Sequence, residues 1–177
     1  MCIRDRSNTG PKRLNFLFQK LKKRGIKIKS IQMQLSLLSK PSLEDENIKI
    51  ICDENEIEYL AYSPLALGIL TVPPNQSPKP TTFLRKSLYQ RILPKTIELR
   101  TLLTNIGKKY SASQAQVALN WVRSHGAKPI VGIRNPNQAK DAISALNWSL
   151  TKSEKQQLDF CRNACLANMP RNPFTSP

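Results

Sequence analysis

The sequence predicts an α/β fold with a parallel sheet, and three observations lead to that prediction. Strand-like and helix-like patterns alternate along the 177 residues, and the connections between them are short. Hydrophobic residues make up 40% of the chain and charged residues 23%, which is ordinary globular composition. About three strands are visible, and a complete parallel sheet needs more. They lie near residues 26–34, 58–62 and 128–132.

The first elements come in the order helix, strand, helix, strand. Residues 10–25 have a proline near the start of an apolar periodic pattern and a glycine as its stop signal. Residues 26–34 then alternate like a strand. A second helix is expected over residues 41–57, with Ser42 as its N-cap, before the short strand at residues 58–62.

A proline-rich loop separates these elements from a helical region. The loop covers residues 71–81, and a helix is expected over residues 93–110. A second helix over residues 111–126 has Ser113 as its expected cap. The strand at residues 128–132 follows it.

Two more helices are expected to close the chain, and each has a clear start signal. Asn135 stands at the N-cap position of the first, with Pro136 as its first helical residue. Thr151, followed three residues later by Glu154, forms the capping box of the second. The remaining residues, 167–177, are expected to be coil.

The charge balance is strongly basic, with a formal net charge of +16. A polyanion such as nucleic acid is therefore one possible partner. The densest basic block, residues 20–29, is also explained as a helix end, where lysine and arginine face the negative end of the helix dipole. No interleaved aromatics, RNP-like run or zinc-finger spacing accompany it. A basic nucleic-acid-binding module stays an alternative that the sequence does not favour.

The sequence favours a reducing compartment and predicts no membrane span. No apolar run approaches the roughly 20 residues that cross a bilayer, and the N-terminus has no apolar signal core. The four cysteines form neither a disulfide framework nor a metal knuckle, so no metal site is expected. Cys161 and Cys165 are expected to pack in the core, and His125, the only histidine, to end a helix. A cytoplasmic location is the default.

Candidate ligand-binding residues follow the strands, because ligands of parallel α/β folds meet the carboxyl ends of the strands. Gln32 lies inside the first visible strand, where a hydrogen-bonded core glutamine is an equally good explanation. Tyr62 offers a flat face for stacking. Arg134 stands before a helix N-terminus, which makes it a candidate phosphate clamp. The other candidates near these strand ends are Ser63, Gly132, Gln138 and Asp141.

Several stretches together resemble the aldo-keto reductases, most closely their cyanobacterial and plastid-type members. The matching blocks keep their order and spacing from residue 7 onward. They are "SN" at 7–8, "SIQMQLSLL" at 30–38, "LAYSPLALGIL" at 60–70, "SASQAQVALNWV" at 111–122, "PIVGIRNPNQAKDAISALNWSLT" at 129–151 and "NPF" near the end.

The resemblance implies a fold, a reaction and a cofactor. The family is a (β/α)8 TIM barrel that transfers hydride between NADP(H) and a carbonyl or alcohol without a metal. Ser7, Asn8 and Gln32 would then hold the nicotinamide carboxamide, with Tyr62 stacked on its ring. The other implied contacts are Ser63, Pro64, Leu65 and Gly68 along the pyrophosphate, Arg134 beside Gly132 at the 2′-phosphate, and Gln138 and Asp141 at the adenosine.

The departures from the family predict a partial barrel. The family's catalytic Asp, Tyr, Lys and His belong to the first half of the barrel, so no catalytic residue is assigned here. Residues 7–177 would be the C-terminal part of one barrel domain, and residues 1–6 are expected to be non-native, adapter-like sequence. Ala142 stands where the family usually has an asparagine that helps to bind adenosine.

The sequence leaves three hypotheses for function. The first is a fragment of an NADP(H)-dependent oxidoreductase that reduces aldehydes or ketones to alcohols. Its parent protein would bind a small carbonyl substrate in the cytoplasm or plastid stroma, and this chain alone would be inactive. The second is a non-catalytic NADP-binding regulatory subunit, and the third is the nucleic-acid-binding module. Because an open barrel leaves strand edges unpaired, self-association is also expected.

Overall fold

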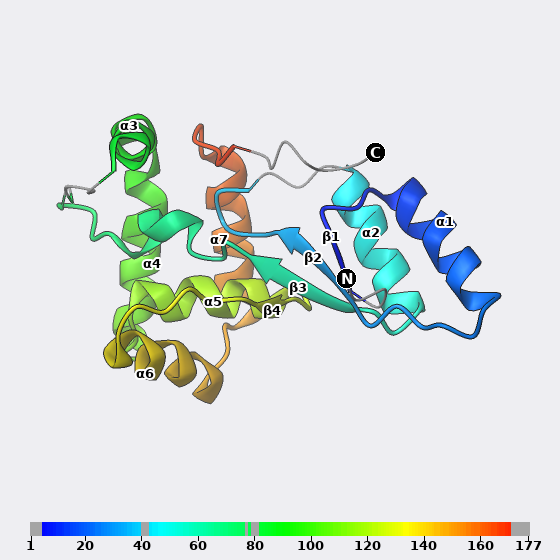
Figure 1. Cartoon of the computed structure of the whole chain (residues 1–177). Helices are drawn as coiled ribbons and strands as arrows, with labels where there is room; N and C mark the ends of the chain where they lie inside the picture. Colours follow the sequence, from blue (N-terminus) through cyan, green and yellow to red (C-terminus); the bar gives the residue numbers. More distant parts are fainter. Residues whose placement is uncertain (1–4, 40–42, 77, 79–81, 171–177) are drawn as a thin grey trace.

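A four-stranded parallel sheet lies at the centre of the protein (Figure 1). The computed structural model describes residues 5–39, 43–76, 78 and 82–170. Within these residues the strands follow one another across the sheet in chain order. They are β1 (Asp5–Ser7), β2 (Ser30–Gln34), β3 (Glu58–Tyr62) and β4 (Lys128–Pro129).

The register of the sheet aligns the carboxyl ends of its strands. Ser7 of β1 lies opposite Gln32 of β2, and Gln34 of β2 lies opposite Tyr62 of β3. Every neighbouring pair is parallel, so the residues after each strand emerge at the same edge of the sheet. This edge is where the sequence analysis placed the candidate ligand contacts.

β1 adds one strand to the about three that the sequence predicts. Residues 5–7 pair with β2, although the sequence before Ser7 lacks the apolar pattern of a strand. Residues 1–4 lie outside the described part of the chain, and the proposed non-native origin of residues 1–6 stays a prediction. β4 is shorter than expected, because its pairing with β3 ends where Ile130 donates its N–H to the carbonyl oxygen of Ala61 (2.8 Å).

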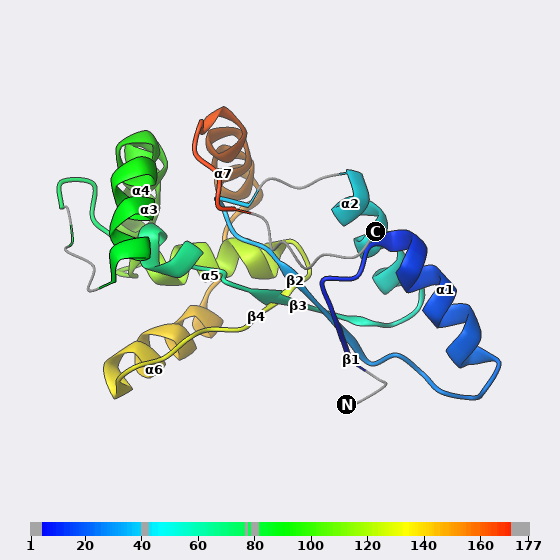
Figure 2. The same cartoon turned by 45° about the horizontal axis from the view of Figure 1, so that its top comes forward.

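Seven helices and three 3₁₀ turns surround the sheet in the described residues (Figures 1 and 2). Both views place α1 and α2 side by side at one end of the sheet, with α3, α4 and α6 toward the other. The helices are α1 (Pro11–Lys22), α2 (Leu43–Glu54), α3 (Phe83–Ile92), α4 (Ile97–Lys109), α5 (Gln114–Ser124), α6 (Pro136–Ser144) and α7 (Lys152–Ala164). The turns are η1 (Ala66–Thr71), η2 (Leu93–Thr96) and η3 (Ala145–Asn147).

The helix starts predicted from capping signals are confirmed where the structure describes them. The Ser113 hydroxyl accepts the first-turn N–H of α5, and the Asn135 side chain does the same for α6. Thr151 and Glu154 form the predicted capping box of α7, with hydrogen bonds in both directions. The predicted cap Ser42 lies outside the described residues.

Helix α3 was not predicted, and the helix expected from residue 93 begins later. Residues 93–96 form the 3₁₀ turn η2 instead, and α4 starts at Ile97. Pro94 explains the break, because proline lacks the N–H that would continue a helix from α3. The start of α3 follows the proline-rich loop directly, and its N-cap residue Thr82 makes no side-chain capping hydrogen bond.

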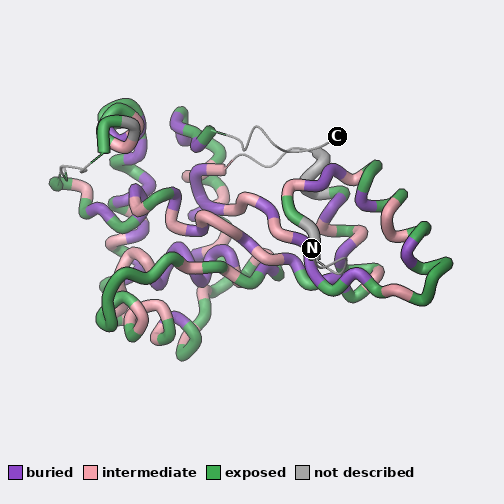
Figure 3. The backbone as a smooth tube through the Cα atoms, viewed as in Figure 1, coloured by how far each residue is buried: buried purple, intermediate pink, exposed green. Residues whose placement is uncertain are grey.

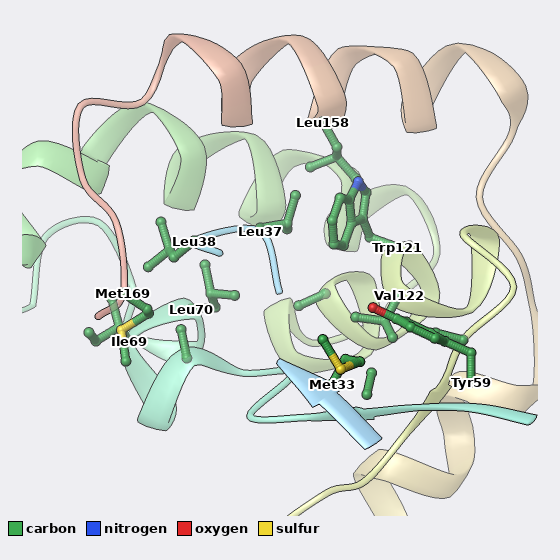
Figure 4. Close-up of a cluster of buried hydrophobic side chains, with 14 of the residues drawn as sticks. Met33, Leu37, Leu38, Tyr59, Ile69, Leu70, Trp121, Val122, Leu158 and Met169 are labelled. Atoms are coloured by element: carbon green, nitrogen blue, oxygen red, sulfur yellow. The ribbon is translucent and has the colours of Figure 1, made fainter. Parts of the chain in front are cut away.

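The hydrophobic core gathers around the sheet and the helices α4, α5 and α7 (Figures 3 and 4). Trp121 of α5 and Leu158 of α7 point toward each other, and both are fully buried. At the other side of this cluster, Met169 lies beside Ile69 of η1. Helix α6 differs from the rest, since none of its residues is buried.

The sequence predicts structural roles for His125, Cys161 and Cys165, and the structure shows what surrounds them. Nδ1 of His125 lies 2.9 Å from the carbonyl oxygen of Trp121 at the end of α5, as predicted for a helix C-terminal residue. Cys165 is buried and Cys161 is half-buried, consistent with packing. In the described residues, no cluster of three His, Cys, Asp or Glu could hold a metal ion. The helices described there are also too short or too polar to cross a membrane.

Candidate nucleotide-binding groove

A groove of about 760 Å³ opens beyond the carboxyl ends of β3 and β4. Its sides are the turn after β3, the segment after β4, and the helices α3, α5 and α6. This volume is within the usual range of roughly 300–1,000 Å³ for ligand sites. Eight residues predicted from the sequence line it: Ser63, Pro64, Leu65, Gly68, Gly132, Arg134, Gln138 and Asp141.

The other four predicted residues form a separate, adjoining cluster. The Tyr62 hydroxyl donates to Oδ1 of Asn8 (2.6 Å), and Nδ2 of Asn8 donates to the Ser7 hydroxyl (3.2 Å). The backbone N–H of Asn8 bonds the carbonyl oxygen of Gln32 (2.9 Å). The structure therefore brings the twelve residues together as two clusters, which meet at the peptide bond between Tyr62 and Ser63.

The turn after β3 has an unusual backbone. Ser63, Ala66, Leu67 and Gly68 all have positive φ, of 53°, 49°, 57° and 94°. Only glycine adopts this region without strain, so the three other residues carry a conformational cost. Such strain is typical of ligand clamps. Tyr89 holds the turn in place, because its hydroxyl donates to the carbonyl oxygen of Leu67 (3.0 Å).

The start of α6 forms the cationic end of the groove. The Gln138 side chain accepts the backbone N–H of Arg134 (2.8 Å), which fixes the backbone just before the helix. The Arg134 side chain is exposed and lines the groove. Free N–H groups and the helix dipole attract anions at this end of a helix, and a guanidinium beside them strengthens that preference.

Asp141, one turn further along α6, supplies the single acidic side chain among the described residues of the groove. Its Oδ2 accepts from the Ser113 hydroxyl (2.7 Å) and its Oδ1 accepts from Nε2 of Gln116 (2.7 Å). The two donors are the N-cap and a first-turn residue of α5, so the carboxylate is held from outside its own helix.

Sequence reasoning missed the contribution of α3. Arg85 and Tyr89, four residues apart on this helix, both line the groove. Burial raises the pKa of Tyr89, while the positive charges of Arg85 and Arg134 oppose that increase. Two guanidinium groups therefore act on the same part of the groove. The spacing of Arg85 and Tyr89 on one helical face was the available signal, but α3 itself had not been predicted.

A buried arginine outside the groove fixes the end of the turn. Arg100 of α4 is 2% exposed and donates to the carbonyl oxygens of Val72 (3.1 Å), Pro73 (2.8 Å) and Leu93 (3.1 Å). Its Nε also donates to the Thr96 hydroxyl (3.2 Å). Burial lowers the pKa of this guanidinium. These bonds tie the end of the turn after β3 to η2 and keep the side of the groove rigid.

Taken together, the two clusters suit an elongated ligand that carries phosphate. Amide and phenol groups at the ends of β1–β3 can hold a flat polar ring. The strained turn and the two arginines can hold anionic groups, and Asp141 can accept from a donor. A dinucleotide has these chemical parts in this order.

Comparison with known proteins identifies one family consistently. The sequence model described as "Aldo/keto reductase family" matches residues 7–163. The chloroplastic pyridoxal reductase of Arabidopsis thaliana is 40% identical over 168 residues, which are 95% of this chain and 46% of that protein. The putative aryl-alcohol dehydrogenase AAD16 of Saccharomyces cerevisiae is 33% identical over 122 residues, 66% of this chain and 35% of that protein.

A solved structure supports the fold. The glycerol dehydrogenase AKR11B4 from Gluconobacter oxydans superposes with a TM-score of 0.72 and 23% identity, covering 97% of this chain and 51% of that one. This likeness confirms the predicted fold, a partial TIM barrel. The chain spans less than half the length of the curated relatives described above.

Proposed function

Because the chain belongs to the aldo/keto reductase family, we propose that it provides the NADP(H)-binding part of an oxidoreductase that interconverts carbonyl compounds and alcohols. The observation that carries this proposal is the groove itself. It combines a strained backbone turn with Arg85 of α3 and Arg134 just before α6, and Tyr62 begins a second polar cluster next to it.

Each part of the site has a proposed contact with the dinucleotide. Ser7, Asn8 and Gln32 would hold the carboxamide of the nicotinamide, and Tyr62 would stack on its ring. The turn from Ser63 to Gly68 would follow the pyrophosphate. When bound, the nicotinamide supplies the hydride. The residues of this chain orient that ring, neutralise the phosphates and hold the adenosine end. The 2′-phosphate would meet Arg134, and the adenosine would meet Gln138 and Asp141.

We propose that this chain does not turn over a carbonyl substrate by itself. A carbonyl oxygen gains negative charge during reduction and needs a positioned proton donor. The resemblance assigns that donor and its Asp, Lys and His partners to the other half of the barrel. A non-catalytic NADP-binding subunit would have the same groove, so the sequence of that other half separates these two alternatives.

Isothermal titration calorimetry with NADP⁺ and NAD⁺ tests the proposed cofactor. We expect NADP⁺ to bind more tightly, because only it offers a 2′-phosphate to Arg134. Arg134→Met should weaken NADP⁺ binding about tenfold or more and leave NAD⁺ binding nearly unchanged. Arg24→Met is the matched control, since Arg24 is exposed just after α1 and does not line the groove. Equal losses for both nucleotides, or no binding of either, would refute the proposal.

The subgroup and compartment also remain proposals. We propose a cyanobacterial or plastid-type member that works in the cytoplasm or plastid stroma, and the chloroplastic Arabidopsis relative supports this. Nucleic-acid binding, suggested by the net charge of +16, predicts salt-dependent retention on immobilised DNA. Such retention without binding of NADP⁺ would favour that alternative.

A further inference from the structure

A chain of hydrogen bonds connects Trp148, outside the groove, to the carboxylate of Asp141 at the groove. The indole Nε1 of Trp148 donates to Oε1 of Gln116 (3.0 Å), and Nε2 of Gln116 donates to Oδ1 of Asp141 (2.7 Å). Gln116 is 8% exposed and belongs to the first turn of α5. It does not line the groove, so any effect on a ligand must pass through Asp141.

The indole decides which way the Gln116 amide points. An indole N–H can only donate a hydrogen bond, so the amide oxygen must face Trp148. The amide NH₂ is therefore left to face Asp141. Trp148 is itself held, because its ring stacks on Tyr110 with the ring centres 4.4 Å apart. The Tyr110 hydroxyl in turn donates to Glu154 at the start of α7 (2.8 Å).

Ser113 provides the second hydrogen bond to the carboxylate of Asp141. Its hydroxyl donates to Oδ2 of Asp141 (2.7 Å) while its oxygen accepts the backbone N–H of Gln116 (3.2 Å). Each oxygen of Asp141 thus has one fixed donor behind it, and the remaining lone pairs can accept from a ligand in the groove. The neighbouring polar side chain of α6, Gln138, already accepts from the backbone of Arg134.

We propose that Gln116 is a positioning residue that keeps Asp141 oriented as an acceptor for an amino group of the ligand, so that the groove prefers adenine to a purine with oxygen in that place. This inference rests on the proposed dinucleotide function. Asp141 is the acidic side chain in a groove with two arginines, and Ala142 beside it offers no polar group. A carboxylate accepts from an amino group and repels a carbonyl oxygen, which gives the preference its direction.

The first test compares NADP⁺ with its analogue in which hypoxanthine replaces adenine. We expect the full chain to bind NADP⁺ about tenfold more tightly, as for a hydrogen bond to a charged group. Gln116→Met keeps the side-chain volume and removes the amide, so this ratio should fall toward one. The preference for NADP⁺ over NAD⁺ should stay unchanged, because it depends on the arginines.

Two variants separate positioning from general damage. Gln114→Met is the matched control, because the Gln114 amide donates to the carbonyl oxygen of Arg100 (2.9 Å) and does not line the groove. In Asp141→Ala the adenine preference should already be lost, so adding Gln116→Met should change the ratio no further. Two other results are informative: Gln116→Met weakens the binding of NADP⁺ and of the hypoxanthine analogue equally, or it has its full effect in the Asp141→Ala background. Either result would show that the role of Gln116 is structural and would refute the proposal.

A cofactor-free measurement follows the chain of bonds directly. The protein has two tryptophans, and Nε1 of Trp121 donates to Asp159 (2.8 Å), so its indole proton is an internal reference. In NMR spectra, Gln116→Met should shift the indole resonance of Trp148, speed its proton exchange and leave that of Trp121 in place. An unchanged Trp148 resonance would overturn the proposal.

The binding experiments also distinguish this inference from the proposed function. If the wild-type chain bound neither nucleotide, both would be refuted. If it bound NADP⁺ without a preference for adenine, only the present inference would be refuted.

Discussion

The Tyr62 hydroxyl donates a 2.6 Å hydrogen bond to the side-chain oxygen of Asn8, 54 positions earlier in the chain. This bond joins the end of β3 to the residue that follows β1, across the end of β2. Asn8 has a positive φ of 52° and directs its amide nitrogen toward Ser7. The amide and the phenol are therefore oriented together before any ligand is bound.

Variants at Tyr62 should separate this bond from ring stacking. Tyr62→Phe keeps the flat ring and removes the bond to Asn8, which should lower the free energy of unfolding by about 1 kcal/mol. Tyr62→Ala also removes the ring, so it should weaken NADP⁺ binding much more than Tyr62→Phe does. Adenosine 2′,5′-bisphosphate, which has no nicotinamide, should bind all three proteins alike in calorimetric titrations. A matching loss for the bisphosphate would show that Tyr62 supports the whole groove instead.

Arg100 should contribute far more to the free energy of unfolding than an ordinary exposed arginine does. Arg100→Met leaves the carbonyl oxygens of Val72, Pro73 and Leu93 without this donor, and Val72 and Leu93 are buried. We expect the free energy of unfolding to fall by about 3 kcal/mol, measured by urea denaturation. Arg91→Met, at an exposed position in α3, should change it by less than about 0.5 kcal/mol. Similar values for the two variants would mean that water replaces the lost donors.

Local signals made much of the fold predictable from the sequence. Ser113, Asn135 and Thr151 are confirmed as helix caps, because capping depends on residues within one turn. β1 escaped prediction because three residues with two charges have no strand pattern of their own. Their pairing with β2 defines the strand, and such long-range contacts leave no periodic signal.

The site was predictable to the extent that it follows strand ends. The turn after β3 and the start of α6 were found in this way and through the family resemblance. Arg85 and Tyr89 were missed because they belong to α3, and Arg100 because nothing in a helical pattern marks an arginine as buried. The division of the predicted residues into two clusters also depends on packing, which the order of motifs does not contain.

His125 should make the protein less stable on mild acidification. Burial lowers the pKa of its imidazole from 6.5, and the hydrogen bond to the Trp121 carbonyl opposes this only in part. The unfolded chain therefore binds the proton first. Stability should be complete above pH 6.5 and fall as the pH drops from there through the lower folded pKa. His125→Gln should flatten this part of the pH profile in thermal melts.

The carboxylate of Glu154 provides a check on that assignment. Burial raises the pKa of Glu154, but hydrogen bonds from Thr151, Tyr110 and Lys109 outweigh it, and the net pKa is lowered. Its contribution is lost only as the pH falls below 4.5, through its folded value. Loss of stability in His125→Gln between neutral pH and this lower window would therefore contradict the role of His125.

Cys52 should be chemically inert in the folded protein. Burial raises the pKa of its thiol to about 12, and the side chain is 1% exposed. Because the thiolate is the reactive form, iodoacetamide at pH 8 should modify Cys52 only after the chain unfolds. Peptide mapping by mass spectrometry, with and without denaturant, measures this. Fast modification of Cys52 in the native protein would show that α2 opens readily.

The outer strands of the sheet predict self-association of this chain. Within the described residues, β1 and β4 each have a neighbour on one side only. Beyond β4, Ile130 is 42% exposed and Ile133 51% exposed. Unpaired edges beside apolar side chains recruit other strands, and the net charge of +16 opposes this by repulsion. Sedimentation velocity should show oligomers that increase with protein concentration and with salt, which screens the repulsion. Ile133→Lys should reduce them, while Phe83→Lys, at an exposed position on α3, should not. A monomer under all these conditions would contradict this prediction.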